Sequence, residues 1–229
     1  MATDKRTNFS LIRKKYEAIG KGNVRLTPST MYLTQLIAAT KSAYTFDVLE
    51  NQTGTLQANE IRLNSNDEFV VSHIGVMLEG TYGALATSPK IRFSYAPIEL
   101  STNCGTVLDL YNGFLKIGVN NIIYLDKWDT KKCEKNTFTQ FTNQVVGTSA
   151  SAHPSNDWSS DTMIALSSLL TLSGAKKNEV TIQLPTAIAP VLVGVTYSDT
   201  GGAPTQIIIN RVAIRFFGLL AQNGAKFQN

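Results

Sequence analysis

The sequence predicts an all-β fold preceded by one short helix, and three observations support this. Ten segments either alternate apolar and polar residues or are rich in β-branched side chains, as strands are. Turn-forming Asn and Gly residues separate these segments, and no long helical patterns alternate with them. Charged residues make up only 17% of the 229 residues, so uncharged polar side chains must cover much of the surface. These features favour a sandwich or a jelly roll over a parallel α/β sheet.

The clearest helical pattern covers residues 8–19. Phe9, Ile12, Tyr16 and Ile19 follow the spacing of a single apolar stripe, and glycines follow directly after it. Basic residues flank the stripe. A short basic amphipathic helix of this kind can lie on an anionic membrane surface, dock on a partner or pack on its own domain.

The net charge of +4 lies entirely in an N-terminal arm, which we take as residues 1–24. The body is neutral, with fifteen basic and fifteen acidic residues, which disfavours a globally basic nucleic-acid-binding domain. Residues 1–22 contain two acids and six bases, namely Lys5, Arg6, Arg13, Lys14, Lys15 and Lys21. The start of the chain lacks the apolar core of a signal peptide, and prolines interrupt the longest apolar stretch, so we expect neither a leader nor a membrane span.

Strands are expected throughout the body, with two-residue turns at Asn112-Gly113 and Asn120-Asn121. Residues 162–172 fit either a helix or a strand, and the polar residues 148–160 before them form a loop or a linker. The predicted strands are Ala43–Leu49, Glu60–Leu63, Glu68–Leu78, Lys90–Tyr95, Phe114–Val119, Ile122–Leu125, Phe138–Val146, Glu179–Leu184, Val191–Tyr197 and Gln206–Phe217.

An ungapped shift of 119 residues aligns residues 59–100 with residues 178–219 at nine identical positions. The shift superimposes a strand start, a mid-strand glycine and a Gly-Ala turn on their counterparts. The repeat predicts two similar β-domains, a first barrel at residues 25–147 and a linker with a second barrel at 148–229.

Catalytic and redox motifs are absent from the sequence. His73 lies in a predicted strand and is interpreted as structural, whereas His153 lies in a polar loop. Cys104 and Cys133 match no metal or redox spacing and are expected to be reduced thiols. We therefore predict a protein that is not an enzyme and holds no cofactor or metal.

Two pairs of acidic residues are compatible with metal binding or catalysis. Asp126 with Asp129, and Asp157 with Asp161, could contribute to a calcium site or a glycosidase pair, although solvated loop carboxylates are the simpler interpretation. Trp128 and Trp158 each lie close to one of these pairs, as exposed sugar-binding tryptophans sometimes do, but single tryptophans are more often core or interface residues.

Taken together, the basic arm, the duplicated neutral β-body and the strand-turn-strand pattern of residues 110–125 resemble a virion structural protein. More narrowly, the chain resembles the double jelly-roll major capsid proteins of tailless icosahedral bacteriophages with an internal lipid membrane. The resemblance implies two tandem jelly-roll barrels per chain and a homotrimer with a pseudo-hexagonal outline that tiles a shell. It also implies contacts with neighbouring capsomers and penton proteins, assembly in a host cytoplasm, and a place in the virion.

The resemblance also implies that the arm lies against the internal membrane. The residues expected to contact the membrane or a partner are Lys5, Arg6, Phe9, Ile12, Arg13, Lys14, Lys15, Tyr16 and Ile19. Nucleic acid is a second possible partner of the arm, but the regular apolar stripe favours a membrane or a protein groove. The alternative functions are a receptor- or carbohydrate-binding β-module of the phage-spike or adhesin type, and a β-sandwich hydrolase that uses the Asp pairs.

Overall fold

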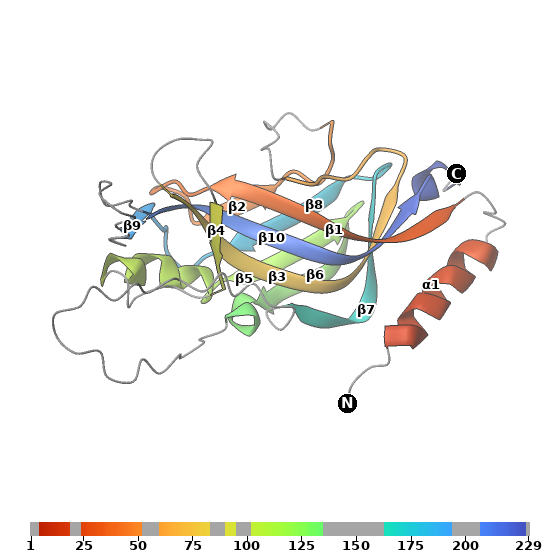
Figure 1. Cartoon of the computed structure of the whole chain (residues 1–229), viewed down its shortest axis with the longest axis horizontal. Helices are drawn as coiled ribbons and strands as arrows, with labels where there is room; N and C mark the ends of the chain where they lie inside the picture. The colour runs from red at the N-terminus through yellow and green to blue at the C-terminus, as the bar shows by residue number, and fades with distance from the viewer. Residues whose placement is uncertain are drawn as a thin grey trace, which may run out of the picture.

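The computed structural model describes residues 5–18, 24–51, 60–82, 90–94, 102–134, 163–193 and 207–227. One helix lies outside a body of antiparallel strands (Figure 1). The elements are α1 (Lys5–Ala18), β1 (Arg25–Leu36), β2 (Ala43–Phe46), β3 (Glu68–Tyr82), β4 (Lys90–Phe93), β5 (Phe114–Val119), β6 (Ile122–Asp129), β7 (Ile164–Ser173), β8 (Asn178–Gln183), β9 (Val191–Val193) and β10 (Ile207–Gln222), with 3-10 helices η1 (Thr102–Leu110), η2 (Thr130–Cys133) and η4 (Gly224–Phe227).

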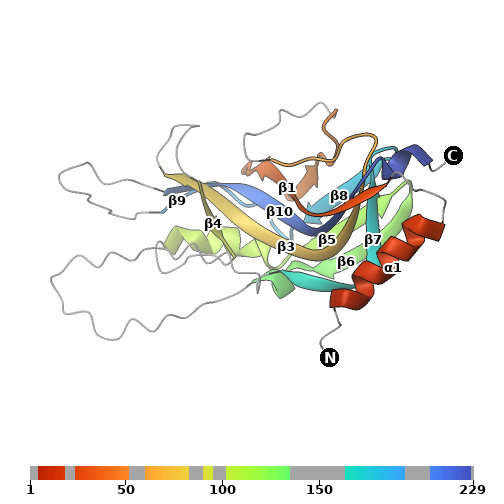
Figure 2. The ribbon, with the colours of Figure 1, turned by 45° about the vertical axis from the view of Figure 1, so that its right-hand side comes forward.

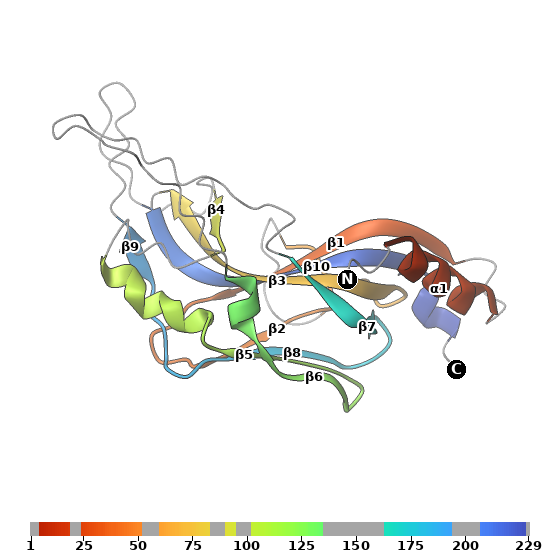
Figure 3. The ribbon, with the colours of Figure 1, turned by 90° about the horizontal axis from the view of Figure 1, so that it is seen from below.

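The strands form two sheets that face each other (Figure 3). The six-stranded sheet has the order β1-β10-β3-β4, with β7 also paired to β3 and β9 also paired to β10. The four-stranded sheet has the order β2-β8-β5-β6. The prediction of an all-β fold is confirmed. The structure also contains the helix α1, which precedes the strands in the chain.

The pairing of the eight principal strands is nested. β1 pairs with β10, β2 with β8, β3 with β7, and β5 with β6, all antiparallel. If β4 and β9, which pair only with end segments of β3 and β10, are set aside, the first strand pairs with the last, the second with the seventh, the third with the sixth and the fourth with the fifth. Successive pairs fall alternately in the two sheets, so the chain winds around the core like one long folded hairpin.

One hydrophobic core lies between the sheets and receives side chains from both of them. Leu33, Ile74 and Phe216 extend into it from the six-stranded sheet, and Ile117 and Val180 extend into it from the four-stranded sheet. Each sheet contains strands from both of the ranges predicted as separate barrels, 25–147 and 148–229. A boundary at residue 148 therefore does not divide the described strands into two sheets or two cores, and these strands form one sandwich.

The first described segment of the sequence repeat folds differently in its two copies. Asn178–Gln183 is strand β8 of the four-stranded sheet, whereas residues 60–63 make only isolated bridges, Tyr32 with Ile61 and Leu49 with Leu63. The shared two-residue alternation of half-buried segments gives similar apolar patterns to segments with different pairing.

Several local predictions are confirmed and others are wrong. β5 has its predicted bounds, and Asn120 and Asn121 form the two-residue turn to β6 with φ of 51° and 67°. Asn112-Gly113 does not join two strands, because the 3-10 helix η1 precedes it. Residues 164–173 are a strand, and β1 was not among the predicted strands. The predicted strand at 138–146 lies outside the described residues.

Candidate functional site

Helix α1 packs Ile12 and Tyr16 of its apolar stripe on the outer face of the six-stranded sheet, at one end of the sandwich (Figure 2). Ile12 and Tyr16 are each 3% exposed and form a small cluster with Val70 of β3 and with Leu219 and Ala221 of β10. Residues four apart lie on the same side of a helix, so this pair faces the sheet together. Of the three roles open to the stripe, the described part of it packs on its own domain.

A buried hydrogen bond reinforces this packing. The Tyr16 hydroxyl donates to Glu68 Oε2 over 2.6 Å, and Glu68 at the start of β3 is fully buried. Burial, followed by the hydrogen bond and the charge of Glu68, raises the pKa of Tyr16 above its ordinary value. The phenol is therefore neutral at physiological pH and donates a hydrogen bond to the Glu68 carboxylate.

The solvent side of α1 is basic. Arg13, Lys14 and Lys15 are exposed, and the Arg13 guanidinium forms an ion pair with Glu17 one turn later, over 2.7 Å. The Lys15 ammonium lies 5.4 Å from the centroid of the Tyr16 ring. These exposed cations are the part of the predicted contact set that faces outward.

The remaining predicted contact residues are less fully described. Lys5, Arg6 and Phe9 belong to α1, but their side chains are not described, and Ile19 lies outside the described residues. Insertion of Ile12 and Tyr16 into a lipid surface is not compatible with the docked helix, since both side chains are buried against β3 and β10. A surface contact by α1 in this conformation therefore uses its cations.

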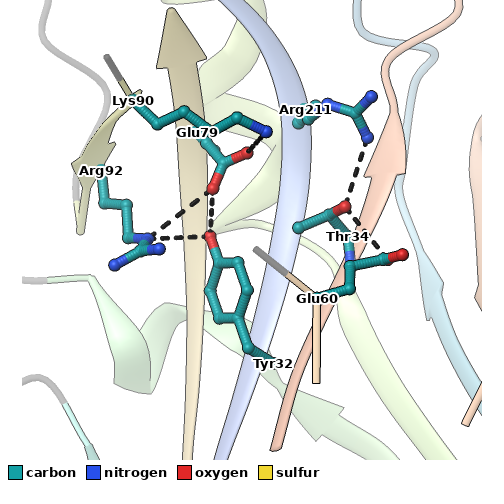
Figure 4. A network of polar contacts seen from close by, with 7 residues as sticks. All are labelled: Tyr32, Thr34, Glu60, Glu79, Lys90, Arg92 and Arg211. Carbon is teal, nitrogen blue, oxygen red and sulfur yellow. Dashed lines mark hydrogen bonds and ion pairs between the residues drawn. The ribbon is translucent and has the colours of Figure 1, made fainter. Parts of the chain in front are cut away.

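A buried polar network connects three strands of the six-stranded sheet (Figure 4). Glu79 of β3 is fully buried and accepts a 2.5 Å hydrogen bond from the Tyr32 hydroxyl of β1. From β4, Arg92 and Lys90 lie 3.6 and 3.5 Å from its carboxylate oxygens, and the Arg92 guanidinium also lies 4.4 Å from the Tyr32 ring centroid. The carboxylate thus holds the short strand β4 against β3.

A second polar contact closes the free edge of β1. Glu60 accepts hydrogen bonds from the backbone N–H and the hydroxyl of Thr34, at 2.8 and 3.1 Å, and from Arg62 at 3.0 Å. Ile61 exchanges backbone hydrogen bonds with Tyr32 of β1 at 2.9 and 3.1 Å. The sequence predicted residues 60–63 as a strand, but their role is to cover the edge of β1.

The residues considered for chemistry do not form a reactive centre in the part of the chain that the structure describes. His73 is half-buried in β3, where its Nδ1 lies 2.9 Å from the Ser72 hydroxyl. Cys133 is a free, buried thiol that donates to the Ile74 carbonyl, and burial raises its pKa to about 12. Within the described ranges, no three His, Cys, Asp or Glu residues lie close enough to hold a metal ion.

Of the acidic pairs and the tryptophans, the structure describes Asp126, Asp129 and Trp128. Asp129 caps η2 by accepting from the Lys131 backbone N–H at 2.8 Å, and Asp126 is exposed on β6. Trp128 packs partly against the core, and the Lys132 ammonium lies 5.4 Å from its ring centroid. Asp157, Asp161, Trp158 and His153 lie outside the described residues, and the side chain of Cys104 in η1 is not described.

A surface that the sequence did not single out lies on the four-stranded sheet. β6 is its terminal strand, and the consecutive residues Ile122, Ile123 and Tyr124 are 60%, 54% and 43% exposed. Three exposed apolar residues in a row are unusual on a folded domain without a binding role. The sequence signal was present as an apolar run after a turn, but alternation alone did not reveal that all three residues of the run are exposed.

Comparison of the chain with protein-family models, with curated proteins and with solved structures finds no match. Among the described helices, none is both long and apolar enough to span a lipid bilayer. Functional inference therefore depends on the geometry of this chain alone.

Proposed function

We propose that the chain is a structural protein of a virion, a capsid subunit that assembles with copies of itself into a closed icosahedral shell. The observation that carries the proposal is the nested pairing of the eight principal strands in two facing sheets. This is the winding of a jelly roll, an architecture used by viral capsid domains and by lectins.

The proposal has one jelly roll in each chain. Two tandem barrels would require two sets of nested strands, and the described strands supply one set around one core. A pseudo-hexagonal trimer depends on two barrels from each of three chains, so it does not follow from this sandwich. The number of chains in the building block is therefore a quantity to measure.

The distribution of charge supports assembly. The body of the protein is neutral, which limits repulsion between the many neighbouring copies in a shell. Short-range contacts through uncharged polar and apolar side chains can then hold the copies together.

Helix α1 provides the second part of the proposal, which is contact with the anionic surface of an internal membrane. The helix is held on the sheet by Ile12 and Tyr16, and Arg13, Lys14 and Lys15 face away from it. Each basic residue near an anionic bilayer contributes about 1 kcal/mol of attraction. The helix would then rest on the headgroups through its cations and keep its apolar stripe in the protein.

Assembly is tested by measuring the mass of the purified protein by light scattering over a range of concentrations, with negative-stain images of the same peaks. We expect defined oligomers that convert to closed particles of uniform diameter. A monomer at all concentrations would overturn the shell proposal and favour the binding-module alternative, which glycan screening would then examine.

Membrane contact is tested by co-sedimentation with vesicles that contain an anionic lipid. The triple variant Arg13→Glu, Lys14→Glu, Lys15→Glu should bind at least about 100-fold more weakly, since about 3 kcal/mol of attraction is lost. The matched control reverses three exposed lysines of the body, Lys41, Lys131 and Lys132, and changes the net charge equally. Equal loss in both triple variants would show that only net charge matters and would overturn a specific role for α1.

A further inference from the structure

The two sheets of the sandwich differ in how well their margins are covered. The edge of β1 pairs with Ile61, and α1 covers one end of the outer face of the six-stranded sheet. On the four-stranded sheet, β6 is terminal, and no described strand pairs with its outer edge. An uncovered edge strand presents free backbone N–H and C=O groups to any other strand that approaches it.

The edge of β6 carries charges in its second half and none in its first half. Asp126 and Lys127 are charged and exposed, and Lys127 has φ of 47° at an irregularity in the β5–β6 register. Charges of this kind oppose edge-to-edge pairing, and bulges interrupt it locally. A second irregularity of the register falls at Tyr124, between Ile123 and Leu125, and leaves Ile122 and Ile123 as exposed, uncharged apolar residues in regular register.

Side chains of this first half extend to both faces of the hairpin. Ile123 lies beside Gly118, Lys116 and Glu179 on the outer face of the sheet, where the four residues line a shallow depression. Ile122 lies opposite the buried Val119 in the register and extends to the other face, because neighbouring residues of a strand point to opposite faces. A partner strand placed along this edge would therefore cover apolar side chains on both of its faces.

We infer that the occupant of this edge is β6 of a second copy of the chain, paired antiparallel about a two-fold axis within residues 122–125. Two identical strands that pair antiparallel are related by such an axis. If residue i of one copy faces residue j of the other, then residue j of the first copy faces residue i of the second. The segment has no charge, so no like charges oppose each other across the axis.

The charges beside the edge also favour a copy of the same surface over an anionic partner. Lys116 and Glu179 form an ion pair at 3.2 Å on this face, the exposed Asp126 and Lys127 of β6 add one charge of each sign, and Lys177 adds one cation at the depression. Such a nearly balanced surface matches itself, whereas a membrane or a nucleic acid would require a larger excess of cations. The choice of a second copy as the occupant rests on the proposed function, in which copies of the chain assemble. The shell proposal does not say which surfaces touch, and the β6 edge would be one of them.

The first test compares Ile123→Lys with Leu192→Lys in solution. Ile123 and Leu192 are 54% and 55% exposed, but Leu192 lies on β9 of the six-stranded sheet, so it is a matched control. We expect Ile123→Lys to raise the dissociation constant of the dimer at least about tenfold, because two lysines then meet near the axis, while Leu192→Lys leaves it unchanged. Equal masses for Ile123→Lys and the unaltered protein would overturn the inference.

The second test places single cysteines at 122, 123, 124 and 125 in a Cys104→Ser background that keeps the buried Cys133, and measures disulfide-linked dimers. Opposed residues of an antiparallel pair have Cα atoms about 4.5–5.5 Å apart, which a disulfide can span. Cross-linking should peak at the position nearest the axis, fall on either side and be absent at Leu192→Cys. A flat profile, or equal cross-linking at Leu192→Cys, would overturn the inference.

The two proposals fail in different ways. If the unaltered protein forms the cross-linked dimer but never a closed particle, the shell proposal fails and the β6 contact stands. If closed particles form and Ile123→Lys leaves both their yield and the dimer unchanged, the β6 contact fails and the shell proposal stands.

Discussion

Replacing Tyr16 with Phe tests how α1 is held on the six-stranded sheet. The substitution removes the hydroxyl that donates to the buried carboxylate of Glu68 at 2.6 Å, and it keeps the ring in place against Val70. A hydrogen bond to a charged group contributes about 1.5–3 kcal/mol. Ile12 and the ring each retain about 1.5–3 kcal/mol of burial, so the helix should loosen while the sandwich stays folded. The population of the undocked helix should rise about 10- to 150-fold.

Trypsin provides the assay, because Arg13, Lys14 and Lys15 are cleavage sites within the helix. A protease cleaves a helix only after local opening, and the rate follows the open population when opening is fast. We expect cleavage of α1 to accelerate about 10- to 150-fold in Tyr16→Phe and to stay unchanged in Tyr124→Phe, whose hydroxyl lies on the exposed strand β6. An unchanged rate in Tyr16→Phe would refute the argument that this bond holds the helix.

Two further predictions concern buried ionisable groups. Glu79→Gln removes the charge that holds Lys90 and Arg92 of β4 and should destabilise the fold by about 2–3 kcal/mol, seen as a fall of roughly 4–12 °C in Tm; an unchanged Tm would contradict this. Burial raises the pKa of Cys133 to about 12 from 9.0. Between these values the unfolded thiol ionises and the folded thiol does not, so stability falls as pH rises through this window. Urea titrations at pH 9 and 10 should show a smaller loss in Cys133→Ala, and equal losses would contradict the assignment.

Sequence patterns predicted those elements whose signals are local. Residues 114–119 and the turn Asn120-Asn121 were predicted correctly because alternation and residues that tolerate positive φ are properties of neighbouring residues. β1 was missed because Pro28 and several hydroxyl residues interrupt its apolar pattern. Asn112-Gly113 was wrongly predicted as a hairpin turn between two strands, because the segment that precedes it is the 3-10 helix η1 and has no strand pattern.

Long-range pairing lies beyond such patterns. Alternation shows that a segment is half-buried but not which strand it will join, so the shift of 119 residues suggested two barrels although β1 pairs with β10 across nearly the whole chain. The apolar stripe of α1 likewise fits a lipid surface or a sheet equally well. Only the position of Val70 and Glu68 beside Ile12 and Tyr16 distinguishes the two.

The positions of α1 and β6 lead to a last prediction, that their two contacts are independent. The helix rests on β3 and β10 of the six-stranded sheet, and the open edge belongs to the four-stranded sheet on the other side of the core (Figure 3). Substitutions at separate sites that share no partners usually have additive effects. Ile123→Lys should therefore bind anionic vesicles as the unaltered protein does at concentrations where both are monomeric.

The arm variant with Glu at 13, 14 and 15 should in turn keep the dimer mass of the unaltered protein. Loss of dimer in the arm variant would mean that α1 takes part in self-association, and the assignment of the two surfaces to separate partners would then be wrong. Independent behaviour would give each subunit one surface for its own kind and another for an anionic surface. A shell needs both if it is to close around a membrane.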